Sequence, residues 1–269
     1  NKARLIAHKK ATIKKTDEIT TSKVKIDALK GELPKDTEST IYRTIVGNTY
    51  GWLDSHGDVH IKGIFTKSLK EKGDKVMHLH DHIQQLSAEV GDNLKVYEQE
   101  VNWSDVSLNK TGVTTALLMD TAVQKEYNPS IFKKYSNGRI NQHSVGMQYV
   151  KVELAINDPE EKEEFATWNK YINQVANKED AENKGYFFAV LEAKLIEISA
   201  VIRGSNELTP TLEPKTKLEE AKSILNDLTV EELKEIHYIC ESKESTALGK
   251  SEPSADTQRK QLFINLLKH

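Results

Sequence analysis

Residues 41–53 are dominated by β-branched and aromatic side chains, with Gly47 and Gly51 inside the run. This composition predicts a long strand in which the glycines allow a bulge or the close approach of another segment. Further strand-like patterns follow as far as Ile202, with helical patterns between them. The strand-like segments are 59–61, 75–80, 94–101, 114–119, 140–154, 186–191 and 195–202, and the helical ones are 63–70, 121–135, 159–176, 214–226 and 230–240. We therefore expect a β-rich α+β domain followed by helices.

Both ends of the chain differ from this middle region. Residues 1–40 combine short apolar runs with lysine and threonine, and we expect edge strands and a linker there. Residues 207–269 are expected to form a helical C-terminal tail, in which Thr229 and Glu232 have the spacing of a capping box. The Ser/Glu/Lys-rich stretch 242–256 is predicted to be a flexible linker within that tail.

Composition excludes several classes of function. Among 269 residues, 38 Lys and Arg stand against 41 Asp and Glu, so no basic excess favours non-specific nucleic-acid binding. No apolar stretch approaches the ~20 residues of a membrane-spanning helix, and the sequence does not begin with an apolar signal-peptide core. A single cysteine cannot form an intramolecular disulfide. We expect a soluble intracellular protein that binds neither nucleic acid nor membrane.

Three histidines alternate at His78, His80 and His82, and on a strand they would share one face. The cluster has three interpretations. It could hold a metal ion, although no cysteine or His-x-x-x-His pair nearby completes a zinc site. One histidine, followed by Asp81, could act as a general base at the end of a strand. The histidines could also be surface residues on a solvated edge, and the residues alone leave these alternatives open.

Two further residues carry chemistry that a strand could deliver into a cleft. Ser144 is followed two positions later by Gly146, so its hydroxyl could be presented beside exposed backbone. The motif is not Gly-x-Ser-x-Gly, because Gln142 stands where the first glycine would be. Glu197 lies in the apolar run 195–202, where a carboxylate either points out of the sheet or holds a cationic partner such as a histidine.

Four motifs occur in order along residues 41–206. They are Gly63-Ile64-Phe65 before a short helix, His80-Asp81 at a strand end, Gly138 to Ser144-Val145-Gly146, and Leu195-Ile196-Glu197-Ile198-Ser199. Together they resemble the prohead (head maturation) proteases of tailed bacteriophages, which are related to the herpesvirus assemblins. The resemblance implies an α+β fold with a β-barrel protease core surrounded by helices, as in the assemblins, and serine endopeptidase activity.

The resemblance also implies roles for particular residues. Carried over by motif, His80 is the general base, Ser144 the nucleophile and Glu197 the third member of the triad. His78 and His82 remain rivals for the base, because the proline-glycine that commonly follows the family's His-Asp pair is absent here. No metal and no other cofactor is implied.

The remaining implications concern the oxyanion and the partners. Arg203 follows the third triad strand and is a candidate for the oxyanion site, to which arginines contribute in the assemblins. The implied substrates and partners are the major capsid protein and the scaffolding protein of the phage, cleaved together with the enzyme itself inside the prohead in the host cytoplasm. Since assemblins act as dimers, a homodimer is an oligomeric state that the resemblance allows. The tail 207–269 would target the capsid or scaffold or pack on the barrel, and self-cleavage in 242–256 could release it.

Two other functions stay open. The same fold could form a catalytically silent capsid-assembly or scaffold-binding protein, because a fold does not imply an activity. The histidine cluster could instead support a metal-dependent hydrolase. A Ser144 hydroxyl beyond hydrogen-bond reach of all three histidines would weaken the protease interpretation.

Overall fold

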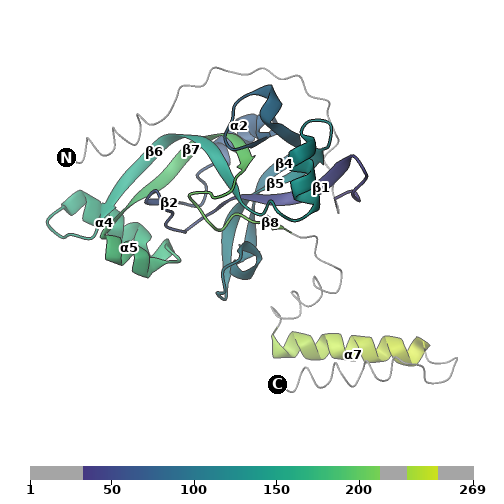
Figure 1. Ribbon diagram of the computed structural model, residues 1–269. Helices are drawn as coiled ribbons and strands as arrows, with labels where there is room; N and C mark the ends of the chain where they lie inside the picture. The colour runs from purple at the N-terminus through teal and green to yellow at the C-terminus, as the bar shows by residue number, and fades with distance from the viewer. Residues whose placement is uncertain (1–32, 213–228, 248–269) are drawn as a thin grey trace. The chain divides into compact units, whose positions relative to one another are not determined.

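The computed structural model describes residues 33–212 and 229–247 (Figure 1). The chain divides into two units, Asn1–Pro214 and Lys215–His269. The first unit contains the sheet and the short helices, and the described part of the second is helix α7, Val230–Ala247. Residues 207–212, which were expected to begin the tail, belong to the first unit, where their last two residues form a strand against β1.

One eight-stranded sheet forms the first unit, with the order β2-β7-β3-β4-β5-β1-β8 and with β6 also paired to β7. Strand β7 is central, because it pairs antiparallel with β6 and parallel with both β2 and β3. All other neighbours are antiparallel. The strands are β1 Thr40–Thr49, β2 Asp58–His60, β3 Met77–His80, β4 Glu89–Asn102, β5 Val113–Gln124, β6 His143–Ile156, β7 Tyr186–Ala200 and β8 Thr211–Leu212.

Short helices connect the strands. Helix α3 has Pro129 in its first turn, and Asn128 caps it by accepting a hydrogen bond from the N–H of Ile131 at 3.1 Å. Helices α4 and α5 lie together at one end of β6 and β7 (Figure 1). The helices are α2 Thr66–Lys72, α3 Pro129–Ser136, α4 Lys162–Tyr171 and α5 Lys178–Lys184, with 3-10 turns at Gly73–Lys75, Leu86–Ala88, Trp103–Val106 and Ile172–Gln174. Within the described ranges, no helix combines the length and apolar character needed to cross a membrane.

The strand order corrects the expectation of a closed β-barrel. Strand β8 is two residues long and pairs with β1, while β6 pairs with β7, so within residues 33–212 the ladder stays open between these edges. A backbone hydrogen bond joins the start of β6 to the segment before β8 instead: the N–H of His143 donates to the carbonyl of Thr209 at 3.0 Å. On the other side, the N–H of Val46 in β1 donates to the carbonyl of Pro210, also at 3.0 Å. The architecture is α+β on one open sheet.

The centre of the core joins β1, β5 and β7. Ile45, Phe65, Leu117 and Ile198 are fully buried in one apolar cluster, and burying a side chain of this size contributes about 1.5–3 kcal/mol. A Cβ on Gly47 would lie 2.8 Å from Cδ1 of Ile198. The glycine predicted to allow a close approach is therefore the point where β1 packs against β7.

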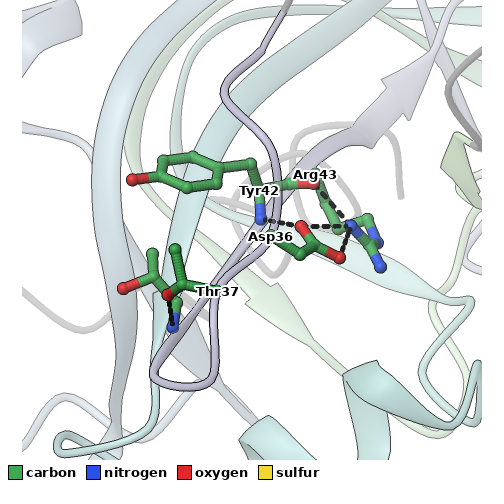
Figure 2. A network of polar contacts seen from close by, with 5 residues as sticks. Asp36, Thr37, Tyr42 and Arg43 are labelled. Atoms are coloured by element: carbon green, nitrogen blue, oxygen red, sulfur yellow. Dashed lines mark hydrogen bonds and ion pairs between the residues drawn. The ribbon is translucent and has the colours of Figure 1, made fainter.

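A small polar network guides the chain into β1, as Figure 2 shows. Asp36 accepts hydrogen bonds from the N–H of Tyr42 at 2.9 Å and from the guanidinium of Arg43 at 2.9 and 3.0 Å. Thr37 accepts one from the N–H of Thr40 at 3.0 Å. Because the Asp36–Arg43 ion pair is partly exposed, it contributes no more than about 1 kcal/mol. Its effect is to direct the chain into the strand.

Three predicted segments differ from the structure. The sequence predicts a helix over 121–135, but β5 continues to Gln124 because β1 and β4 pair with it on both sides, and α3 begins only at Pro129. The segments 186–191 and 195–202 form one strand, β7. Strands β2 and β3 pair with its two halves while β6 spans both, so tertiary pairing outweighs the local pattern. Helix α5 was not predicted.

In the second unit the predicted capping box is confirmed. Oγ1 of Thr229 accepts a hydrogen bond from the N–H of Glu232 at 3.3 Å, and Oε2 of Glu232 accepts one from the N–H of Thr229 at 2.8 Å. Helix α7 extends to Ala247, so the first residues of the predicted linker 242–256 are helical. The predictions for 1–32, 214–226 and 248–269 lie outside the described residues.

Candidate active site

Ser144 and Glu197 come together on neighbouring strands. In the β6–β7 ladder Ser144 lies directly opposite Ser199, and Gly146 lies directly opposite Glu197. Residues directly opposite each other on paired strands point to the same face of a sheet. The side chains of Ser144, Ser199 and Glu197 therefore project from one face, and the glycine leaves space beside the carboxylate.

The carboxylate of Glu197 is 1% exposed and holds two partners. Its Oε1 lies 2.6 Å from Nδ1 of His82, and its Oε2 accepts a hydrogen bond from the hydroxyl of Ser199 at 2.6 Å. An ionised carboxylate only accepts, so Nδ1 of His82 carries the proton and Nε2 of the neutral ring has a lone pair. The hydrogen bond to Glu197 raises the pKa of His82 above 6.5, although burial opposes the shift. This is the arrangement of a base oriented by a carboxylate.

A strained turn brings His82 to this face. Asp81 and His82 have φ angles of 53° and 57°, in the left-handed region that residues other than glycine rarely adopt. The N–H of Asp81 donates to the carbonyl of Ala200 at 2.9 Å, and the N–H of His82 donates to Oγ of Ser199 at 3.1 Å. Each such residue costs about 1–3 kcal/mol, and strain of this kind clusters at functional sites.

The partner of Glu197 is thus His82 and not His80, the residue implied by the motif. His78 and His80 lie opposite Ile198 and Ala200 in the β3–β7 ladder, which puts them on the other face of the sheet from Glu197. Nδ1 of His80 lies 2.9 Å from Oδ2 of Asp81. The expectation that all three histidines share one face is wrong, because the turn at 81–82 interrupts the alternation of β3.

Two buried histidines are linked behind the site. The hydroxyl of Tyr135 lies 3.0 Å from Nε2 of His78 and 2.8 Å from Nε2 of His143. Nδ1 of His78 lies 2.8 Å from Oγ1 of Thr121, and Nδ1 of His143 lies 3.1 Å from the carbonyl oxygen of Thr209. Burial lowers the pKa of His78 well below 6.5 and that of His143 to about 4. Both rings are neutral at pH 7, and the chain they form anchors the start of β6.

These two histidines should make the fold sensitive to acid. In the unfolded chain each histidine takes up a proton near pH 6.5, whereas burial holds both folded pKa values below that. The stability that the neutral rings contribute is complete above pH 6.5 and is lost as the pH falls towards 4. For His143 the loss at pH 5 is on the order of 2 kcal/mol. Urea unfolding at pH 7 and pH 5 measures this loss in the free energy of unfolding.

A variant isolates this contribution. His82 acts in the opposite direction, because its raised pKa gives stability that is present below pH 6.5 and lost as the pH rises through the folded value. His143→Gln should therefore reduce the fall in the free energy of unfolding between pH 7 and 5. Equal pH dependence in the wild type and His143→Gln would contradict the interpretation.

The segment that follows β7 passes beside Ser144. A Cβ built on Gly204 would lie 3.6 Å from Cβ of Ser144 and 2.8 Å from the carbonyl oxygen of His143, so glycine permits this close passage. Arg203 immediately precedes it and is exposed. Arg203, the candidate for the oxyanion site, therefore lies on the segment that borders Ser144.

No hydrogen bond joins the hydroxyl of Ser144 to His78, His80 or His82 within residues 33–212. Ser144 is partly exposed, and the side chain of His82 is 41% exposed, so solvent reaches both. Ser199 lies between them, because it is opposite Ser144 in the ladder and accepts a hydrogen bond from the N–H of His82. Catalytic hydrogen bonds often form only when substrate is bound.

The histidine cluster does not converge on a metal site, because its three members have separate partners on two faces of the sheet. The group of potential metal ligands found among the described residues is instead Asp54, Asp58 and His60. Sequence reasoning missed this group, although the spacing Asp-x-x-x-Asp-x-His at a turn before a short strand was a signal. It also missed Ser199 as a partner of Glu197.

No family model, curated protein or solved structure matches the chain. The geometry around Ser144 is therefore the observation that bears on function.

Proposed function

We propose that this chain is a serine endopeptidase of the prohead-protease type, in which Ser144 is the nucleophile, His82 the general base and Glu197 the residue that orients the base. The observation that carries the proposal is the 2.6 Å contact of Glu197 with Nδ1 of His82, on the sheet face from which Ser144 projects. Burying a carboxylate is costly unless it is paired. Here the pairing is made through a turn with two residues in left-handed conformations.

The proposed chemistry is acyl transfer. Nε2 of His82 takes the proton of the Ser144 hydroxyl as Oγ attacks the scissile carbonyl carbon. Glu197 stabilises the resulting imidazolium, which then protonates the amine as the peptide C–N bond breaks. Water, deprotonated by the same imidazole, hydrolyses the ester to a carboxylate and restores Ser144. Ser199 fixes the second oxygen of Glu197 and so acts as a positioning residue.

Arg203 fits the same proposal as an oxyanion residue. It precedes Gly204, which passes beside Ser144, and its exposed side chain carries a positive charge. A cation near the tetrahedral intermediate stabilises the negative charge that develops on the carbonyl oxygen.

The proposed substrates are the scaffolding protein and the major capsid protein of a tailed phage, together with the enzyme itself, cleaved inside the prohead. The support is the order of the four motifs and the way the third and fourth meet on β6 and β7. An assemblin-like protease core, a homodimer and a capsid- or scaffold-binding C-terminal tail belong to the same proposal.

A fluorophosphonate probe, which phosphonylates activated serines, tests the site directly. We expect the full-length chain to be labelled at Ser144, as mapped by peptide mass spectrometry, and Ser144→Ala to lose that label. Ser136→Ala, at an exposed serine, is the matched control and should label like the wild type. Intact-mass measurements with capsid and scaffold proteins should show fragments that Ser144→Ala does not produce. Absence of both label and fragments in the wild type would reject the proposal.

One observation favours a second candidate function, a catalytically silent capsid-assembly or scaffold-binding protein. The hydroxyl of Ser144 makes no hydrogen bond with any of the three histidines in the described part of the chain. On this alternative, Glu197 and His82 only hold the turn at 81–82 in place. Binding of scaffold without label or cleavage would support it.

A further inference from the structure

Thr209 is a fully buried residue of the segment between β7 and β8, and it holds the main chain next to Ser144. Its carbonyl oxygen accepts a hydrogen bond from the N–H of His143 at 3.0 Å and lies 3.1 Å from Nδ1 of that ring. Its hydroxyl donates to the carbonyl of His143 at 2.6 Å. One threonine therefore binds both main-chain groups of the residue that precedes the proposed nucleophile.

The hydroxyl of Thr209 has one proton and three acceptors near it. The carbonyl of His143 is at 2.6 Å, the carbonyl of Asn206 at 3.1 Å and Oε1 of Gln142 at 3.3 Å. The shortest contact has the geometry of a strong hydrogen bond, so the proton belongs to the bond with His143. The side chain at 209 thus fixes the start of β6 through a bond that only a hydroxyl at this place can make.

Ser144 needs such a bond because it is the second residue of β6. The ends of strands open more readily than their centres. Along one edge of β6, the ladder with β7 holds Ser144 opposite Ser199. Along the other edge β6 has no strand partner among the described residues. At this end of β6, Thr209 supplies the contacts that a second neighbouring strand would otherwise provide.

The loop that ends at Thr209 also carries Arg203, the candidate for the oxyanion site. At the start of this loop the N–H of Val201 donates to the carbonyl of Gln142 at 3.0 Å. Further along, Nε2 of Gln142 donates to the carbonyl of Glu207, also at 3.0 Å. Thr209 therefore closes a loop that is tied to the start of β6 at three successive places.

We infer that Thr209 is a positioning residue of the proposed peptidase, which sets the place of Ser144 relative to His82 and Arg203. The inference rests on the proposed function. Glu197 orients His82 from the β7 side, whereas Thr209 holds the nucleophile from the opposite side. Reacting atoms must approach to about 3–3.5 Å in alignment, and a displacement of about 1 Å can cost 10²-fold in rate. Thr209 acts through the main chain and touches no reacting atom.

The kinetics of fluorophosphonate labelling of the full-length chain test this role. In that reaction Oγ of Ser144 bonds to phosphorus, fluoride leaves, and His82 takes the proton. Thr209→Val keeps the shape of the side chain but removes the hydroxyl, so the rate at saturating probe should fall by about 10- to 100-fold. The probe concentration that gives half of this rate should change by no more than a few-fold. Thr209→Ser keeps a hydroxyl and should restore the rate to within a few-fold of wild type.

Thr49→Val is the matched control for the loss of a buried hydroxyl. Thr49 is fully buried at the end of β1, and its hydroxyl donates to the carbonyl of Leu208, the residue before Thr209. Urea denaturation should show a similar loss of stability in Thr49→Val and Thr209→Val. Labelling of Thr49→Val should stay within a few-fold of wild type. An equal fall in labelling in both variants would show that lost stability slows the reaction, and would overturn the inference.

Amide hydrogen exchange measures the position of the strand end without activity. Thr209→Val should speed exchange of the amides at 143–146 by about tenfold and leave β4 and β5 unchanged, because only the end of β6 loses its hold. A wild type without label would reject the proposed function and this role of Thr209 with it. A labelled wild type, together with a Thr209→Val variant that labels and exchanges in the same way, would overturn this inference alone.

Discussion

Replacing His82 with alanine should lower cleavage of scaffold and capsid proteins by about 10²- to 10⁴-fold, the usual contribution of a general base. Replacing His80 with alanine should change it by no more than a few-fold. The reason is geometric: His82 contacts Glu197 at 2.6 Å on the face of Ser144, whereas His80 contacts Asp81 and lies on the other face. Intact-mass spectrometry measures the rate of fragment formation in the wild type, His82→Ala and His80→Ala.

The pH profile of the same reaction distinguishes a base from a structural residue. Because Glu197 raises the pKa of His82, cleavage should increase with pH through a value above 6.5. Glu197→Gln removes the negative charge and should move that value downward, which a purely structural role for His82 would not do. The reverse result, with His80→Ala inactive and His82→Ala active, would restore the residue implied by the motif and refute this assignment.

Replacing Gly146 with alanine should destabilise the first unit by about 3 kcal/mol and abolish labelling of Ser144. A Cβ on Gly146 would lie 2.0 Å from Oε1 of Glu197 and 2.9 Å from its Cγ, so the whole side chain would have to move. Movement breaks the hydrogen bonds to His82 and Ser199 and leaves a buried carboxylate unpaired, which costs about 3–5 kcal/mol. Urea denaturation gives the stability.

Two further variants show whether the collision of the new Cβ with Glu197 causes the loss of stability in Gly146→Ala. Gly73→Ala introduces a Cβ no closer than 3.7 Å to another atom, in ordinary helical backbone, and should be neutral or slightly stabilising. In a Glu197→Ala background, Gly146→Ala should cost much less than in the wild type, since the colliding atoms are gone. Additive losses in the double variant would show that Gly146 matters for another reason.

Much of the sheet could be predicted from residue patterns, because β-branched runs such as 41–53 and 94–101 are long and locally consistent. The predictions fail where pairing with neighbouring strands, and not the local residue pattern, determines the secondary structure. Residues 121–123 are in a strand because both β1 and β4 pair with them, and an opening between β8 and β6 is not visible in any local pattern. The structure therefore has an open sheet where the resemblance implied a closed barrel.

The candidate site could be predicted in its residue types but not in its pairing. Ser144 and Glu197 were identified, and their strands do place them on one face. The motif implied His80, but two consecutive residues with positive φ bring His82 to Glu197 instead. Such a turn depends on hydrogen bonds to Ser199 and Ala200, more than 110 residues away in the chain.

The chain of contacts around Tyr135 contains fewer protons than it needs. It runs from the carbonyl of Asp92 through Thr121, His78, Tyr135 and His143 to the carbonyl of Thr209, which makes five contacts. With both rings neutral, its four side chains supply one proton each. One of the five contacts must therefore lack a hydrogen. The position of this gap in the chain of contacts determines the tautomers of both rings. An extra proton would fill it, but burial opposes the charge. The tautomers of the two imidazoles buried behind Ser144 are therefore coupled, because both rings cannot carry their proton on Nε2 unless a second contact also lacks a hydrogen.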